Sequence, residues 1–138
     1  MHESELGQRR LARQAESVMQ IDLDKEVKTV ADLGIEWAAR HERASLLEEL
    51  KKTLLAQLIG EVMAESRKDG KKGISFAQAE TEALADVRYE GHLREMTEAR
   101  KEANVARVRH ETAGVRLEMM RSLMATRREE MRLSGMVR

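Results

Sequence analysis

Histidines are the first residues of this sequence that could hold a metal ion or transfer a proton. They stand at His2, His41, His92 and His110. Neither His41-Glu42 nor His110-Glu111 extends to the His-Glu-x-x-His pattern, which places two imidazoles on one helix face for zinc. His92 and His110 could instead form a pH-sensitive pair, but a polar residue in a helix-packing face more often sets register or oligomeric state. We therefore favour the structural role for these two histidines.

Carboxylates supply the second candidate chemistry. They are neighbours at Glu48-Glu49, Glu80/Glu82 and Glu129-Glu130, on what we expect to be solvated helix faces. The Glu-x-x-His pairs of a di-iron bundle are missing, as are a glycine-rich phosphate loop, a serine nucleophile elbow and any cysteine. The sequence therefore predicts no enzyme, no catalytic residue, no metal site, no cofactor and no small-molecule substrate.

Arginine and methionine gather near the C-terminal end of the chain. The candidate interaction residues there are Arg116, Met120, Arg121, Met124, Arg127, Arg128, Met131 and Arg132, with Met119 beside them. Methionine adapts to varied binding surfaces, and arginine is enriched in the cores of protein interfaces. This end is therefore a candidate surface for a protein partner. The equally weighted alternative is an ordinary helix-packing core with ion pairs on its flanks.

A second cationic cluster lies in a glycine-containing segment. It consists of Arg67, Lys68, Lys71 and Lys72, with Asp69 offsetting one charge. Such a cluster could bind phosphates with salt-dependent affinity, although the commoner role is to keep a turn solvated. The chain as a whole has no net charge, but residues 1–100 carry a net −4 and residues 101–138 a net +4. Direct nucleic-acid binding through the Arg-rich end and the Lys-rich turn is therefore the alternative function.

The composition indicates the elements that must position these residues. Ala, Glu, Lys, Leu and Arg together make 77 of the 138 residues, and proline and cysteine are absent. This composition is typical of long helices and coiled coils, and it argues against β-sandwiches, barrels, alternating βα folds and disulfide scaffolds. With three aromatic residues the core must be thin, so we expect a second copy or a partner to complete it.

Turn and capping signals divide the chain into an N-terminal segment, residues 1–24, and a helical hairpin, residues 25–138. The first segment is predicted to be a short helix over 2–19 followed by a joint at 21–24, where Asp22 or Asp24 could cap the next helix. The hairpin is predicted as a helix over 25–68, a turn over 69–75 and a helix over 76–133. Ser75 with Gln78 forms a capping box at the start of the last helix. A kink at Ala85-Asp86 could separate residues 76–84 from the rest.

The last predicted helix carries a heptad repeat of the kind found in coiled coils. One position of the repeat is Tyr89, Met96, Ala103, His110, Leu117, Met124 and Met131, and the other is His92, Ala99, Ala106, Ala113, Met120 and Arg127. A short turn makes the flanking helices antiparallel, which places each residue i opposite a residue near about 144 − i. The Leu-rich helix then covers the Ala-rich half of its neighbour. The predicted fold class is an all-α, antiparallel, coiled-coil-like hairpin that forms an oligomer.

No membrane segment or leader is expected from the sequence. The N-terminal residues are acidic where a signal peptide would be basic, and the longest apolar stretch, near residues 54–62, is interrupted by polar residues. A membrane span needs about 20 predominantly apolar residues in a row. We therefore expect an intracellular, cytoplasmic protein without a membrane partner.

Three stretches carry a resemblance to a known class of proteins. They are Leu84-Ala-Asp-Val-Arg-Tyr-Glu-Gly-His-Leu93, Val115-Arg-Leu-Glu-Met-Met-Arg-Ser-Leu123 and Ala125-Thr-Arg-Arg-Glu-Glu-Met131. Over about residues 40–133 the chain resembles small helical-hairpin proteins encoded by tailed bacteriophages near recombination or replication genes. The resemblance implies an accessory protein of phage DNA metabolism in the host cytoplasm, without catalytic residues. The expected function is a helical interaction protein that self-associates or docks on a protein partner.

Overall fold

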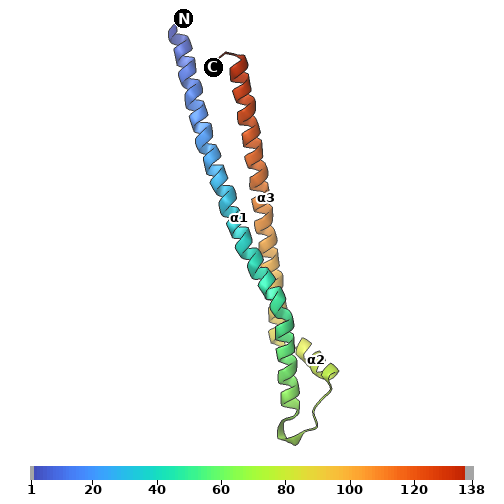
Figure 1. The fold of residues 1–138 in the computed structure, drawn as a ribbon. Helices are drawn as coiled ribbons and strands as arrows, with labels where there is room; N and C mark the ends of the chain where they lie inside the picture. Colours follow the sequence, from blue (N-terminus) through green and yellow to red (C-terminus); the bar gives the residue numbers. More distant parts are fainter. Residues whose placement is uncertain (1, 136–138) are drawn as a thin grey trace. The chain divides into compact units, whose positions relative to one another are not determined.

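Helices make up nearly all of the structure. The computed structural model describes residues 2–135, with side chains from Ser4 onward. Its elements are α1 (His2–Ser66), a 3-10 turn (Lys68–Gly70), α2 (Phe76–Leu84) and α3 (Val87–Leu133), as Figure 1 shows. No strand occurs within residues 2–135, which confirms the all-α class. The last three residues of the predicted hairpin segment lie outside the described residues.

The prediction of a separate N-terminal helix and a joint at residues 21–24 is wrong, because α1 continues through this segment. Residues 21–24 contain neither proline nor glycine. Asp24 accepts a hydrogen bond from Gln20 Nε2 at 3.0 Å, one helical turn away, instead of capping a new helix. Leu23 is half-buried, so the apolar spacing also continues across the predicted joint. At its other end α1 stops at Ser66, two residues before the predicted boundary.

Contacts divide the chain into two compact units, each of which contains part of α1 and part of α3. We call residues 37–105 the central unit. The terminal unit comprises the residues up to Glu36 and those from Ala106 onward.

In the central unit α1 and α3 run antiparallel. Arg40 of α1 lies 3.1 Å from Glu102 of α3, whereas Glu61, further along α1, lies 2.7 Å from Arg88 near the start of α3. Ala44 and Ala99 between these pairs, and Ala103 next to Glu102, are buried, with Leu47 packed against them. The small alanines let the helices approach closely, as the match of a Leu-rich helix with an Ala-rich one predicts.

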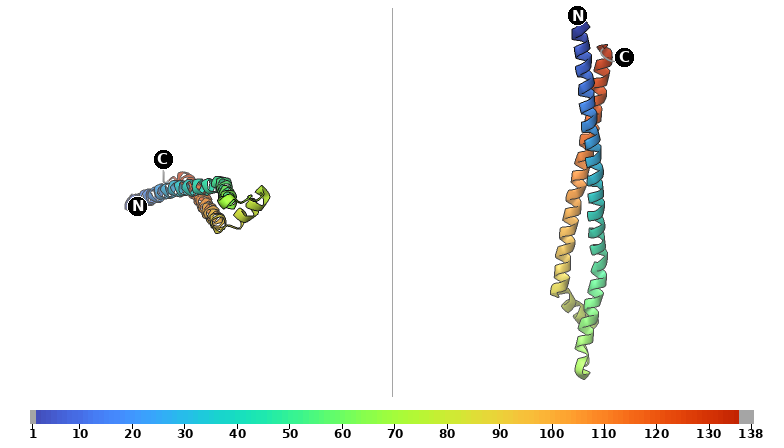
Figure 2. Two further views of the ribbon diagram at one scale, coloured as in Figure 1. Left: turned by 90° about the horizontal axis from the view of Figure 1, so that it is seen from below. Right: turned by 90° about the vertical axis from the view of Figure 1, so that its left-hand side faces the viewer.

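The end of the central unit holds a second apolar cluster, where α2 packs beside α1 (Figures 1 and 2). Its buried members are Leu58, Ile59, Ala79, Ala83 and Tyr89. The capping box is confirmed at its Ser75 half, because the Ser75 hydroxyl accepts a hydrogen bond from the Gln78 N–H at 3.2 Å. Leu58 is almost fully buried, so this cluster anchors the unit.

The predicted helix over 76–133 is broken at Ala85-Asp86, the position at which the sequence allowed a kink. The Asp86 carboxylate accepts a hydrogen bond from the Arg88 backbone N–H at 2.8 Å, as an N-cap does. The same carboxylate accepts from the Arg88 side chain. The bonds from Arg88 lower the pKa of Asp86, and the side-chain bonds of Arg88 to Asp86 and Glu61 raise the pKa of Arg88. The cap therefore starts a new helix and redirects the chain from α2 into α3.

In the terminal unit α1 and α3 also run antiparallel. Met19 lies beside Arg127, Glu26 beside Arg116, and Gly34 beside His110. The pairing of Gly34 with His110 agrees with the register expected from the turn. Along α3 the heptad positions face inward, because each of them from Tyr89 to Met131 is buried or half-buried except Arg127.

Candidate functional site

A groove forms in the terminal unit between the first part of α1 and the last part of α3. Its volume is about 430 Å³, and it is lined by Arg13, Glu16, Ser17, Met19, Gln20, Met124, Arg127, Arg128 and Met131. We call it the Arg/Met groove. Four of the predicted interaction residues, Met124, Arg127, Arg128 and Met131, come together here.

Methionines form the apolar part of the Arg/Met groove. Met124 is buried, whereas Met19 and Met131 are half-buried and remain partly open to a ligand. Unbranched thioether side chains can change rotamer at little cost, so they fit apolar groups of different shape. Met19 was missed in the sequence analysis, although it stands four residues before Leu23 and shares its inward face.

Arginines form the polar part of the groove. Arg127 Nη1 lies 3.8 Å from the sulfur of Met19, which is a weak acceptor. Among the described residues, none of Arg13, Arg127 and Arg128 makes an ion pair with a carboxylate, and Glu16 is the acid that lines the groove. The groove therefore combines apolar thioethers with guanidinium groups that can still bind carboxylates or phosphates.

The other predicted arginines of this end are already paired. Arg116 lies 3.6 Å from Glu26 of α1, and the side chain of Glu26 is only 15% exposed. Arg121 pairs with Glu118 at 3.0 Å and Arg132 with Glu129 at 2.6 Å, each within α3. These three arginines fit the interpretation of ion pairs that flank a helix-packing core. Met120 is half-buried on the inward face of α3.

The Lys-rich turn belongs to the central unit and not to the unit that holds the Arg/Met groove. Lys68 pairs with Glu65 at 2.7 Å, and this contact raises the pKa of the Lys68 ammonium. Lys71 and Lys72 are exposed. The turn bends at Asp69, Gly70 and Gly73, which all have positive φ, a conformation that favours glycine.

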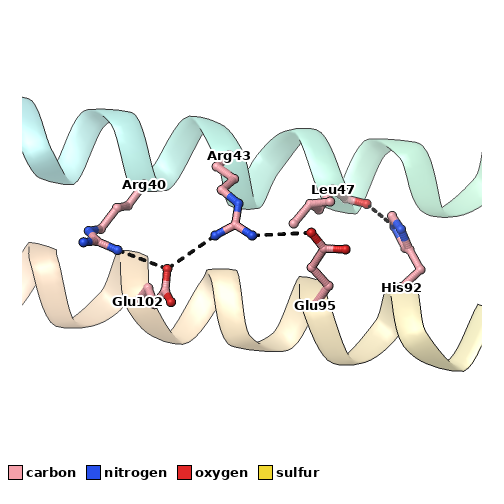
Figure 3. Close-up of polar contacts among 6 residues, drawn as sticks. All are labelled: Arg40, Arg43, Leu47, His92, Glu95 and Glu102. Carbon is pink, nitrogen blue, oxygen red and sulfur yellow. Dashed lines mark hydrogen bonds and ion pairs between the residues drawn. The ribbon is translucent and has the colours of Figure 1, made fainter.

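Two of the four histidines bind backbone carbonyl groups across the helix pair. In the central unit His92 Nε2 lies 2.7 Å from the carbonyl oxygen of Leu47 (Figure 3). In the terminal unit His110 Nδ1 lies 3.1 Å from the carbonyl oxygen of Val30. A carbonyl can only accept, so each of these ring nitrogens carries a proton and donates it. Both histidines therefore act in helix packing, while the side chain of His2 lies outside the described residues.

Ion pairs across the central unit complete its packing (Figure 3). Arg43 bridges Glu95 at 3.4 Å and Glu102 at 3.5 Å. On the other flank Arg100 donates to both carboxylate oxygens of Glu48, at 2.8 and 2.9 Å. This fork lowers the pKa of Glu48. Each flank thus pairs residues that only an antiparallel arrangement in this register brings together.

Neither a metal centre nor a membrane span emerges from the part of the chain that the structure describes. Within residues 2–135 no three histidine, cysteine, aspartate or glutamate side chains are grouped so that they could hold a metal ion. No helix in that range is long and apolar enough to cross a bilayer.

Apolar side chains also line the outer face of α3, from which the sequence analysis singled out only Met119. Val108, Val115, Met119 and Leu123 are each more than half exposed. Val108, Val115 and Met119 recur at intervals of seven and four residues, so a second helical repeat on the same helix was the signal that could have found them.

Comparison with known proteins identifies no relative of this chain. Protein-family models, curated proteins and solved structures were all compared with the chain, and none of them matches it.

Proposed function

We propose that this protein is a non-enzymatic helical interaction protein that self-associates and docks on a protein partner. The observation that carries the proposal is the apolar surface of the terminal unit. Its exposed large apolar side chains are Leu6, Leu11, Val18, Ile21, Val27, Ile35, Val108, Val115, Met119, Leu123 and Leu133. The apolar residues that are buried in this unit are Ala106, Ala113, Leu117 and Met124. Of the exposed side chains, Val115, Met119 and Leu123 line one hollow together. Contiguous exposed apolar surface marks sites at which another polypeptide binds.

The Arg/Met groove supports docking of a protein partner with a particular chemistry. The guanidinium groups of Arg13, Arg127 and Arg128, which make no ion pair with a carboxylate among the described residues, favour carboxylates. The methionines that line the same groove favour an apolar anchor. A helix that carries an apolar residue flanked by acidic residues satisfies both requirements. The resemblance over residues 40–133 supports a role beside phage recombination or replication proteins, so we propose that the chain is an accessory factor of this kind in the host cytoplasm.

Direct nucleic-acid binding is the second candidate function. The observation in its favour is that Arg9, Arg10, Arg13, Arg127 and Arg128 make no ion pair with a carboxylate among the described residues. Guanidinium groups of this kind bind phosphates, and each neutralised phosphate adds salt-dependent affinity. No aromatic side chain lines the Arg/Met groove to stack on bases, which favours the protein partner over a single strand.

Three measurements test the proposed function. Light scattering at micromolar concentration should show a species larger than the monomer, and a monodisperse monomer that melts cooperatively would overturn self-association. Affinity capture from the native host should retain a protein with the unmodified chain and lose it with Arg127→Glu/Arg128→Glu. Labelled single- and double-stranded DNA should not bind at low or moderate salt. DNA binding that the same double substitution abolishes would establish the second candidate instead.

A further inference from the structure

An uncharged stripe runs along the outer face of α3 in the terminal unit. It consists of Val108, Thr112, Val115, Met119, Ser122 and Thr126, at alternating intervals of four and three residues, with Leu123 beside it. All of these side chains are exposed, Val115 and Met119 to 62% and Leu123 to 65%. We call this set the α3 stripe. Its spacing is that of a second coiled-coil face, distinct from the face that packs on α1.

The α3 stripe points away from α1. The residues that face α1 over the same length are His110, Ala113, Leu117 and Met124, all buried or half-buried. On a helix with 3.6 residues per turn, the stripe lies nearly opposite these residues. No described residue of the terminal unit covers the stripe, because Val108, Val115 and Met119 remain more than half exposed.

Charged residues of opposite sign border the two edges of the α3 stripe. A helical wheel places Glu111 and Glu118 along one edge, and Arg109 and Arg116 along the other. The contacts of Glu111 and Arg116 within the chain are long. Glu111 lies 4.0 Å from Arg107, and Arg116 lies 3.6 Å from Glu26. Both side chains are largely exposed, so each can turn from its long contact within the chain to a molecule that covers the stripe.

We propose that the α3 stripe binds the α3 stripe of a second copy of this chain, with the two helices parallel and in register. In a parallel coiled coil, a residue on one edge meets the residue five positions later on the opposite edge of the neighbouring helix. Glu111 then meets Arg116 of the second copy, and the two-fold symmetry makes this pair twice. An antiparallel pairing would place Glu opposite Glu and Arg opposite Arg. The edge charges therefore select both the occupant and its direction.

The inference rests on the proposed function, because it assigns the surface and the geometry of the self-association. It leaves the Arg/Met groove free, since none of the residues of the α3 stripe lines that groove. A parallel dimer would place two Arg/Met grooves at the same end of the assembly. Its two copies could then engage one partner or two identical sites.

Two single-cysteine variants test the direction of the pairing, because the chain contains no cysteine of its own. Val108→Cys and Thr126→Cys lie near opposite ends of the α3 stripe and at equal distances from Leu117. In the parallel dimer, mild oxidation of either variant should join the new cysteine to the same cysteine of the second copy. When the two variants are mixed, a disulfide between position 108 of one chain and position 126 of the other should not be favoured. In an antiparallel dimer only the mixed pair would form. Thr53→Cys, an exposed position on α1 in the central unit, measures cross-linking by random collision.

Charge substitutions test the proposed ion pair on the protein without cysteine. Glu111→Lys should raise the dimer dissociation constant roughly fivefold, because it faces Arg116 twice. Glu118→Lys is the matched control, because the residue five positions later on the neighbouring helix, Leu123 of the second copy, carries no charge. This substitution should change the dissociation constant much less. Met119→Glu should raise the constant at least about tenfold by placing two carboxylates in the apolar layer, while far-UV circular dichroism of the diluted protein stays unchanged.

The possible outcomes separate the inference from the proposed function. Self-pairing of both cysteine variants supports the inference. Cross-linking of the mixed pair alone overturns the parallel direction. If the protein is a dimer but both stripe variants cross-link no more than Thr53→Cys does, the α3 stripe is not the interface, while self-association itself is still supported. A monomer at every accessible concentration overturns both.

Discussion

In the terminal unit, the imidazole of His110 lies directly against the bare backbone of Gly34. A Cβ added at Gly34 would stand 3.0 Å from His110 Cε1 and 3.3 Å from Nδ1. The same Nδ1 donates to the carbonyl of Val30, one turn earlier on α1, at 3.1 Å. The glycine in the middle of a helix, which weakens the helix by itself, therefore provides the space in which a histidine of α3 binds α1.

The first prediction concerns Gly34→Ala. Replacing glycine by alanine inside a helix normally stabilises it by about 1 kcal/mol. Here the new methyl group must push the His110 ring away from Val30, so we expect a net destabilisation of about 1 kcal/mol. Gly60→Ala and Gly91→Ala are matched controls, because a Cβ at either position meets nothing within 4 Å. Urea unfolding gives the free energy of unfolding of all three variants. An equal gain in this free energy at the three positions would contradict the role of Gly34.

The second prediction concerns Arg43, which bridges Glu95 and Glu102 across the central unit (Figure 3). Arg43→Glu would place three carboxylates together. Because these side chains are about half exposed, the expected loss in the free energy of unfolding is only about 1 kcal/mol. Adding Glu95→Arg should recover much of it, and the double-mutant cycle gives the coupling energy. A coupling energy near zero would mean that Arg43 does not help to set the register.

The third prediction concerns the pH dependence of the α2–α3 junction. Hydrogen bonds from Arg88 lower the pKa of Asp86 below its ordinary value of 3.8. A carboxyl group whose pKa is depressed in the folded state stabilises the protein above the unfolded pKa, and this stabilisation is lost as the pH falls through the folded pKa. The protein should therefore lose this stabilisation on acidification below pH 3.8.

Asp86→Asn isolates the charge, since asparagine caps a helix about as well as aspartate. The wild type should be the more stable of the two at neutral pH, and the difference should shrink as the pH drops below 3.8. Asp32→Asn, at an exposed position of α1, is the control. A difference that stays constant with pH in thermal unfolding would contradict the ion pair.

Spacing rules predicted the long helices, and local signals predicted their ends less well. The inward placement of the heptad from Tyr89 to Met131 was confirmed, because every position of the repeat except Arg127 is buried or half-buried. The joint at residues 21–24 was wrong because an aspartate can equally bind a residue one turn away, as Asp24 binds Gln20. Sequence alone does not show whether the Asp24 carboxylate caps a new helix or accepts a hydrogen bond from a side chain one turn away, since either bond satisfies it.

The candidate site was predicted only on one of its two helices. Arginine and methionine on α3 pointed to its C-terminal end, but whether each arginine stays free depends on the neighbour that the fold provides. Arg116 forms an ion pair with Glu26 on α1, whereas Arg127 contacts the sulfur of Met19. This difference comes from the register of α1 against α3, which the composition of α3 does not contain.

The last prediction separates arginines that hold the fold from arginines that bind a partner. Arg127→Glu/Arg128→Glu should change the free energy of unfolding by no more than about 0.5 kcal/mol for each residue, because both are exposed and unpaired among the described carboxylates. The same double substitution should abolish capture of the protein partner. The complex of the unsubstituted chain with its partner should weaken as the salt concentration rises.

Arg121→Glu/Arg132→Glu is the matched control, with the same change of charge on the same helix. Its arginines pair with Glu118 and Glu129 within α3 and do not line the Arg/Met groove. If general electrostatic attraction to the basic end were responsible for binding, both double variants would lose the partner equally. Loss confined to Arg127→Glu/Arg128→Glu would place the contact in the groove, since Arg127 and Arg128 line it together with Met19, Met124 and Met131, which can accept an apolar anchor.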